Sequence, residues 1–299
     1  MSQKLKLIGL LLLPLLLYVV GLIAYFSDTI NSFVFLPLIM VGLTLSIIFV
    51  ILFKKQQNIF LAIAILLVIL FLFELRLVSY EANTYIAMSY MEPIEVVEKS
   101  GIYVMAVSTT NVPYIEDPKY MIESLEYTQH REVLEYESVT NRIRYFSKNN
   151  ELLGYIGFKT NDFNDMKSNV NAYLQSDSPS IKNFFNREDL EGDSAGLALA
   201  LSGLYEKGQL ENTLSLAVTG AIDNKGNVSA IGSVISKILI AEKNNMPYII
   251  LPIGNEVEAQ KVKLEKKLKI EIIAVEHIDE AVKEIEKINV SNYATIKLI

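Results

Sequence analysis

Cysteine is absent from this 299-residue chain, and histidine occurs only twice, as His130 and His277. Without cysteine the chain has no disulfide framework, no thiol nucleophile and no thiolate metal site. Two histidines are too few for a metal cage built on imidazole ligands. The sequence therefore predicts neither a metal site nor another cofactor.

Positive charge is scarce in the larger part of the chain. Residues 79–299 carry 22 Lys and Arg against 32 Asp and Glu, which gives a net charge of −10. Binding to nucleic acid needs clustered Lys and Arg that neutralise phosphates. We therefore predict that nucleic acid is not a partner.

Residues 1–78 hold few charges of either sign and raise the mean hydropathy to +0.31. Their apolar runs cover residues 7–26, 29–53 and 56–73, and a membrane-spanning helix needs about 20 residues. A cleaved signal peptide fits badly, because its apolar core is about 7–15 residues and two further runs follow here. We predict three transmembrane helices within residues 1–78, with the lipid bilayer as a partner. Alternatively, the third run is a buried hairpin partner or an interfacial helix.

The distribution of lysines predicts how these helices are oriented. Lys4 and Lys6 precede the first run and Lys54 and Lys55 precede the third, whereas the loop at residues 27–32 has no cation. Loops of membrane proteins that are rich in Lys and Arg generally lie on the cytoplasmic side. A multi-pass protein of the cell membrane with an extracytoplasmic domain over residues 79–299 is therefore expected. A transporter is disfavoured, since the runs carry no intramembrane charge before Glu74.

The remaining residues predict a soluble domain of mixed structure. Residues 79–150 form a membrane-proximal segment, with a strand at 102–108 and a charged, helical stretch at 117–144. A strand at 155–158 and a polar loop at 162–191 follow. From residue 197 onward, strands alternate with helices up to residue 288, and residues 291–299 form a tail. This alternation predicts an α+β domain over residues 151–290, in which helices pack on a mixed sheet.

Ser194 lies where an apolar helix begins, between Gly192 and Gly196. Unpaired backbone N–H groups and the positive end of the helix dipole meet at that point and would stabilise an oxyanion. The glycines would let a substrate backbone approach closely. A serine at a helix start is, however, more often an N-cap, so this segment alone leaves both interpretations open.

Lys237 shares a helix face with the apolar residues Val234, Ile238 and Ala241. A lysine on such a face either extends its ammonium to water or loses its charge, because desolvation lowers its pKa. A buried, neutral Lys237 would be a candidate general base. A serine and a neutral lysine suffice for acyl transfer without histidine, but the residues alone do not bring the two side chains together.

Three segments resemble the proteolytic domain of the Lon proteases in order and spacing: GDSAG around Ser194, LAVTGAIDNKGNVSAIGSVISKILIA through Lys237, and PYIILP after it. The resemblance extends over about residues 155–288 and implies the Lon proteolytic-domain fold. It also implies that Ser194 is the nucleophile and Lys237, 43 residues later, the base. Thr219 matches the threonine that hydrogen-bonds the lysine in that family.

The neighbours of Ser194 match the family less closely. Glu191 stands where many members have aspartate. Asp193 replaces the proline of many bacterial members and resembles the GDSA form of archaeal ones. With Gly192, these residues are expected to support the site.

Among Lon proteins, the chain is most similar to membrane-anchored, Lon-like serine proteases that lack an ATPase. Those proteases carry a PDZ module and have one membrane span. This chain has no PDZ-sized insertion before the segment of Ser194, and three spans are expected. No GxxxxGK[ST] phosphate loop occurs, so ATP-driven action is not expected.

The sequence thus predicts a membrane-anchored, ATP-independent serine endopeptidase that uses a Ser–Lys dyad through an acyl-enzyme. Unfolded or membrane-associated proteins or peptides are the expected substrates, and the resemblance implies a possible homo-oligomeric ring. The alternative is a catalytically silent, Lon-like scaffold that binds peptides or regulates a membrane partner.

Overall fold

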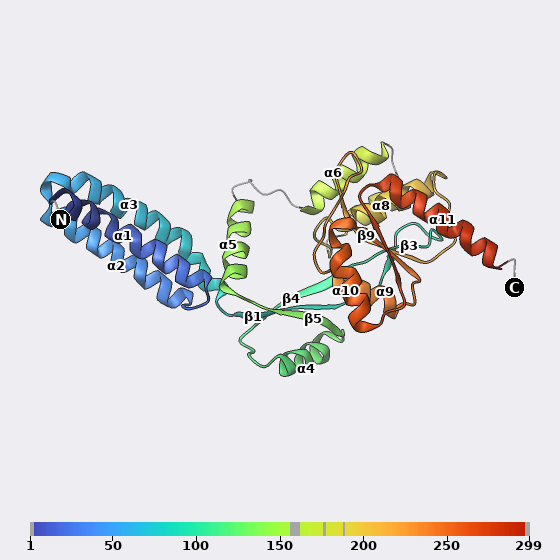
Figure 1. Ribbon diagram of the computed structural model, residues 1–299, viewed down its shortest axis with the longest axis horizontal. Coiled ribbons are helices and arrows are strands. Elements are labelled where there is room, and N and C mark those ends of the chain that lie inside the picture. The colour runs from blue at the N-terminus through green and yellow to red at the C-terminus, as the bar shows by residue number, and fades with distance from the viewer. Residues whose placement is uncertain (1–2, 156–161, 176–177, 188, 297–299) are drawn as a thin grey trace. The chain divides into compact units, whose positions relative to one another are not determined.

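The computed structural model of the protein describes residues 3–155, 162–175, 178–187 and 189–296. The chain divides into two compact units. The first consists of Met1–Ile86, Asn111–Asp117 and Glu137–Lys159, and the second of Ala87–Thr110, Pro118–Tyr136 and Thr160–Ile299. Figure 1 shows the helices and strands of both units and labels many of them.

Three apolar helices begin the first unit: α1 (Gln3–Phe26), α2 (Ser32–Leu52) and α3 (Gln57–Glu74). They pack side by side in Figure 1. Asn31 caps α2, because its side chain accepts a hydrogen bond of 3.2 Å from the backbone N–H of Val34. Short 3-10 turns follow α2 and α3, at η1 (Lys54–Gln56) and η2 (Leu75–Tyr80).

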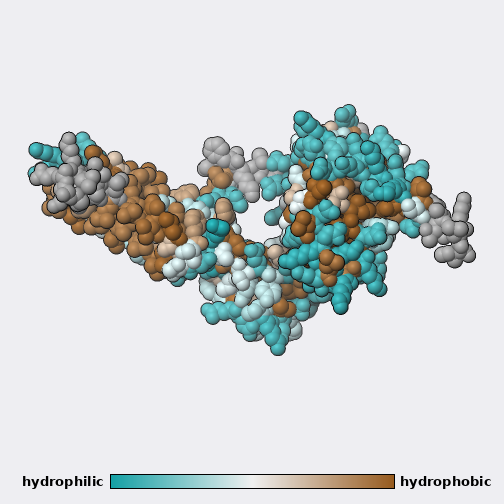
Figure 2. Space-filling model, in the orientation of Figure 1, coloured by the Kyte–Doolittle hydropathy of each residue, from teal (hydrophilic) through white to brown (hydrophobic). Residues whose placement is uncertain are grey.

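The outer face of this helix bundle is apolar, as the brown surface in Figure 2 shows. Ile23, Ile51 and Leu72 are each more than 60% exposed, at 63, 67 and 62%. Phe35 and Leu67 fill the interior. Soluble proteins rarely expose so extensive an apolar surface, which suits contact with lipid.

Two helical stretches of the described chain are long and apolar enough to cross a membrane, Ser32–Leu52 and Lys54–Tyr80. The first predicted span lies in α1, whose described apolar part, Leu13–Phe26, is shorter than the other two. Length and composition therefore indicate two spans among the described residues, and the third stays a prediction.

Helix α5 (Asn141–Tyr155) is tied to the bundle by buried polar groups. The Lys148 Nζ lies 2.5 Å from Glu74 Oε2, and neither side chain is exposed. The hydroxyls of Tyr18 and Tyr145 donate to the other oxygen of Glu74, at 3.0 and 3.1 Å. These contacts hold α5 on the end of α3.

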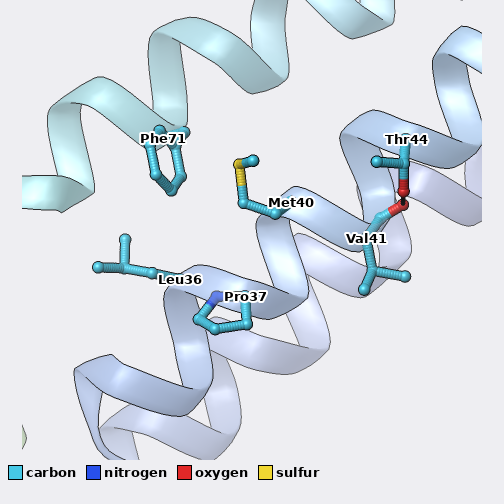
Figure 3. A pocket seen from close by; sticks show the side chains of 6 residues that line it. All are labelled: Leu36, Pro37, Met40, Val41, Thr44 and Phe71. Atoms are coloured by element: carbon cyan, nitrogen blue, oxygen red, sulfur yellow. Dashed lines mark hydrogen bonds between the residues drawn. The ribbon is translucent and has the colours of Figure 1, made fainter.

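An apolar groove of about 520 Å³ opens on the bundle between α2 and α3. Figure 3 shows the side chains that line it: Leu36, Pro37, Met40, Val41, Thr44 and Phe71. None of them is ionisable, and the one hydroxyl, on Thr44, donates to the backbone oxygen of Val41. The groove therefore has no group for acid, base or nucleophilic chemistry.

A five-stranded sheet forms the centre of the second unit. Its order is β10 (Glu271–Val275), β9 (Tyr248–Pro252), β6 (Leu216–Val218), β3 (Ile102–Val104) and β2 (Ile94–Glu95). The first four strands are parallel and β2 is antiparallel to β3. The sheet is mixed, and the predicted α+β class is confirmed.

Alternate residues of these strands bury opposite faces of the sheet. Leu216 and Val218 pack into a core with α6 (Asp162–Leu174), α8 (Gly196–Glu206) and α11 (Ile278–Ile296). Between them, Ala217 faces a second core. That core holds side chains of α9 (Val234–Lys243) and α10 (Glu256–Lys266). Helices therefore cover both faces, and α8 and α9 lie on different faces.

A second sheet has three strands in the order β4-β1-β5, with β1 (Asn83–Tyr90), β4 (Val107–Pro113) and β5 (Val133–Ser138). The second unit also contains α4 (Pro118–Gln129), α7 (Pro179–Phe185), η3 (Ile253–Asn255) and the hairpin of β7 (Ala221–Ile222) and β8 (Val228–Ser229).

The prediction of a polar loop at residues 162–191 is wrong, because its described part contains α6 and α7. The apolar residues of α6, spaced by three or four positions, are diluted by polar ones, so the helical stripe is hard to see: Phe163, Met166, Val170 and Leu174 are all buried. Pro179 begins α7 rather than breaking a helix, and Ser178 caps it by accepting from the N–H of Ile181.

Three smaller predictions also differ from the structure. The stretch 117–144 was expected to be helical but contains β5 between α4 and α5. The single strand expected at 102–108 is two strands, β3 and β4. Of the strand expected at 155–158, Tyr155 is the last residue of α5, and the rest lies outside the described residues.

Candidate active site

Ser194 is held at the start of α8 by backbone hydrogen bonds to the end of β6. Its carbonyl oxygen accepts from the N–H of Gly220 at 2.8 Å, and the N–H of Leu197 donates to the carbonyl of Gly220 at 2.9 Å. Ala195 is the N-cap residue of the helix, and no side chain caps it. Ser194 is therefore not the N-cap, and its hydroxyl is available for other contacts.

Lys237 lies on the first turn of α9 and points into the protein. The helix begins after Ser233, whose φ of 54° is left-handed, and the N–H of Lys237 donates to the carbonyl of Ser233 at 3.2 Å. The lysine is 3% exposed. Of the two alternatives left open by the sequence, burial of the amine is the one that the structure adopts.

The functional groups of Ser194, Thr219 and Lys237 meet at one point. The Lys237 Nζ lies 2.7 Å from Ser194 Oγ and 3.2 Å from Thr219 Oγ1. The Thr219 hydroxyl, fully buried after β6, donates to the backbone oxygen of Ser194 at 3.2 Å. A neutral amine at this position would accept the serine proton, whereas an ammonium would donate to both hydroxyls.

Burial lowers the pKa of Lys237 from 10.5 to about 8, because desolvation disfavours the ammonium. The carboxylate of Asp193 opposes this shift by attracting the positive charge. The amine is thus neutral in a substantial fraction of molecules slightly above neutral pH, which a general base requires.

A cleft of about 570 Å³ gives access to these groups. One part of it is lined by residues 189–194, Gly232, Ser233 and Lys237. Residues 106–109, Met91 and Arg131 line another. Ser194 and Lys237 therefore border this cleft, whereas Thr219 lies behind them.

The predicted supporting residues differ in what they do. Asp193 and Glu191 are exposed carboxylates in the cleft, and only Asp193 affects the pKa of Lys237. Gly192 has a φ of +83°, a conformation that side chains disfavour. The backbone N–H groups of Ser194 and Ala195 have no hydrogen-bond acceptor among the described residues. Both are consequently available to a developing oxyanion.

Sequence reasoning missed the contribution of the segment before the proteolytic domain. Ser108 and Arg131 line the cleft. Glu135 contacts α9, the helix that carries Lys237, because it accepts a hydrogen bond of 2.9 Å from the Ser236 hydroxyl. None of the three belongs to a recognisable motif. Ser108 lies in β4, Glu135 lies in β5 and Arg131 just precedes β5, so these residues are placed by the pairing of β4 and β5 with β1.

Comparison with known proteins shows which family this part of the chain matches. Residues 189–287 match the model of the Lon protease (S16) C-terminal proteolytic domain, and this part of the chain belongs to that family. The match begins later than the resemblance expected from residue 155. It supports a serine-type peptidase domain.

Curated relatives agree with the family match. The chain is 32% identical over 94 residues to the Lon protease of Syntrophomonas wolfei and 33% over 93 residues to that of Wolbachia pipientis. It is 34% identical over 93 residues to the archaeal Lon protease of Pyrococcus abyssi. Each alignment covers 31% of this chain but only 12, 11 and 9% of the respective relative. The similarity is therefore confined to the proteolytic domain.

Proposed function

We propose that the protein is a membrane-anchored, ATP-independent serine endopeptidase in which Ser194 and Lys237 form the catalytic dyad. The observation that carries this proposal is the 2.7 Å separation of Lys237 Nζ and Ser194 Oγ, with the lysine 3% exposed. A serine hydroxyl is a weak nucleophile, and a neutral amine within hydrogen-bonding distance activates it.

The reaction proceeds in two steps. In acylation, Lys237 Nζ accepts the hydroxyl proton while Ser194 Oγ attacks the peptide carbonyl carbon, and the N–H groups of Ser194 and Ala195 stabilise the oxyanion. The tetrahedral intermediate then expels the amine, which receives the proton from the Lys237 ammonium. An ester joins the acyl part of the substrate to Ser194.

In deacylation, water takes the place of the serine hydroxyl as the nucleophile and Ser194 Oγ is the leaving group. Lys237 Nζ takes a proton from water as the water oxygen attacks the ester carbonyl. When the carboxylic acid leaves, the ammonium returns the proton to Ser194 Oγ. Thr219 touches both partners, through Lys237 Nζ and the carbonyl of Ser194, and so orients the amine towards the serine.

We further propose that α1, α2 and α3 anchor the protein in the cell membrane as a multi-pass bundle, with the proteolytic domain extracytoplasmic. The apolar exteriors of α2 and α3 support the anchor, and the four lysines before the first and third runs support the orientation. Outside the cytoplasm ATP is not supplied. Unfolded or membrane-associated proteins are accordingly the proposed substrates, and a homo-oligomeric ring is a possible assembly.

The test compares the full-length protein with Ser194→Ala and Lys237→Arg in detergent or liposomes, with fluorescent casein as the probe. Both variants should lose essentially all cleavage, because a guanidinium does not deprotonate near neutral pH. Ser291→Ala and Lys261→Arg, on exposed positions of α11 and α10, are the matched controls and should keep full activity. Equal cleavage by wild type and Ser194→Ala would contradict the dyad. Peptide binding without cleavage by any form would favour the silent scaffold.

A further inference from the structure

Arg131 lies in the loop between α4 and β5, outside the part of the chain that matches the Lon family. It lines the catalytic cleft together with the segment that carries Ser194. It also lines a second hollow, of about 630 Å³. Residues 90–95, Arg187 and Asp189 complete that hollow.

The two hollows adjoin because Met91, Arg131 and Asp189 line both. An extended peptide bound at Ser194 would therefore continue past Arg131 into the second hollow. A side chain of this peptide, some residues away from the scissile bond, would lie beside the guanidinium.

The charges around this junction leave Arg131 without a carboxylate partner. Arg187 and Asp189 neutralise each other, with Nε 2.9 Å from Oδ1 in a two-point contact. Arg131 Nη1 donates to the hydroxyl of Ser108 at 2.9 Å. No described carboxylate lies within 4.0 Å of the guanidinium, and its side chain is exposed to the cleft.

We propose that Arg131 is a specificity-determining residue that binds a carboxylate of the peptide substrate, and that the enzyme consequently prefers an acidic side chain at one position near the scissile bond. This inference rests on the proposed function. A guanidinium presents a planar set of N–H donors that matches a carboxylate in a two-point contact. The bond to Ser108 uses one of these donors and fixes the orientation of the rest.

The remaining charges of the cleft restrict where the acidic residue lies. Glu191 and Asp193 are carboxylates near Ser194 and repel a substrate acid there. Glu92 and Glu95, which line the second hollow, repel a substrate acid there likewise. The preferred acid is therefore separated from the scissile bond and lies at the junction of the two hollows, beside Arg131. The C-terminal carboxylate of a peptide could bind the guanidinium in the same way as an acidic side chain. The experiment therefore distinguishes these two carboxylates.

The experiment uses the full-length protein in detergent and quenched-fluorescent peptides taken from one site that it cleaves in casein. Each position on both sides of the scissile bond is replaced in turn by Glu or by the uncharged isostere Gln. Every peptide is made with a free and with an amidated C-terminus. The readout is kcat/KM for each pair, for wild type, Arg131→Ala and Arg131→Glu. Arg142→Ala, an exposed arginine in α5 that carries the same charge change, is the control.

Wild type should cleave the Glu peptide at one position about fivefold better than its Gln counterpart, as expected for a partly exposed ion pair. Arg131→Ala should abolish this preference, Arg131→Glu should reverse it, and Arg142→Ala should retain it. High salt should reduce it. If only a free C-terminus gives the preference, the carboxylate is terminal and the side-chain assignment is overturned.

Failure of this inference differs from failure of the proposed function. If wild type cleaves and Ser194→Ala does not, but the Glu preference is missing or survives in Arg131→Ala, the assignment of Arg131 is wrong and the dyad stands. If wild type and Ser194→Ala do not differ, the peptidase itself is wrong, and the role of Arg131 falls with it. Thermal unfolding of each variant verifies that the exposed substitutions leave the fold intact.

Discussion

Ser236, the residue before the proposed base, donates a hydrogen bond of 2.9 Å to Glu135, which lies 101 residues earlier in β5. Ser236 is fully buried in α9. The hydrogen bond thus ties the helix that carries Lys237 to a strand outside the Lon-matched region. A carboxylate acceptor makes such a bond stronger than a neutral pair.

Replacement of Ser236 by alanine removes this tie and leaves the Glu135 oxygen without its partner. We expect a loss of about 1–2 kcal/mol in the free energy of unfolding. We also expect a fall in kcat, because α9 is less firmly placed against Ser194. Glu135→Gln keeps an acceptor and should cost less than Glu135→Ala. In a double-mutant cycle, Ser236→Ala and Glu135→Ala should be strongly coupled; additive effects would show that the hydrogen bond does not stabilise the site.

The pH dependence of kcat/KM should follow the titration of Lys237. The base must be neutral, and its pKa is lowered to about 8. Activity should therefore rise as pH increases through about 8 and level off above it, in a profile measured with one uncharged peptide. A profile that is highest at pH 6 would contradict a neutral lysine base.

Asp193→Asn should move this profile to lower pH. The Asp193 carboxylate raises the pKa of Lys237 against the effect of burial, so its removal makes the amine easier to deprotonate. Because Asp193 is exposed, the shift should be small and should shrink with added salt. Glu211→Gln, which removes an exposed carboxylate outside the cleft, should leave the profile in place. A shift of the profile towards higher pH would show that the Asp193 carboxylate does not raise the pKa of Lys237.

Much of this site could be predicted from the sequence, because its chemistry lies in short, spaced motifs. Ser194, Lys237 and Thr219 were assigned through their resemblance to one family, and the structure brings all three together. From residue 197 onward the predicted strands alternate with predicted helices, and the structure has them with small changes of boundary up to residue 275. The last helix, α11, continues to Ile296, into the stretch that was predicted to be a tail.

The parts that the sequence did not predict depend on long-range packing. Arg131 and Glu135 belong to no motif. The strand β5, which pairs with β1, brings Arg131 to the cleft and Glu135 to α9. Helix α6 has a diluted apolar stripe, which is completed as a core only when it packs on α8. Local patterns therefore identify the proposed reacting groups, whereas the walls formed by residues 106–109 and Arg131 arise from tertiary structure.

Thr219→Val keeps the shape of the side chain and removes its hydroxyl. That hydroxyl contacts Lys237 Nζ at 3.2 Å and the carbonyl of Ser194 at 3.2 Å. We expect kcat to fall about tenfold, a loss of about 1.4 kcal/mol in transition-state stabilisation, with little change in KM. Thr219→Ser retains the hydroxyl and should keep most of the activity. Equal kcat values for the Val and Ser variants would exclude an orienting role.

The buried pair of Lys148 and Glu74 should govern the stability of the first unit rather than the chemistry of the second. Lys148→Met leaves the Glu74 carboxylate buried with only the hydroxyls of Tyr18 and Tyr145, and should destabilise the unit by about 3–5 kcal/mol. Lys148→Met with Glu74→Leu removes both charges and should restore most of this loss, because apolar replacements of a buried ion pair are often neutral. Thermal unfolding of the full-length protein in detergent measures both effects. Equal destabilisation by the single and double variants would mean that packing at Lys148, not the ion pair, holds α5 in place.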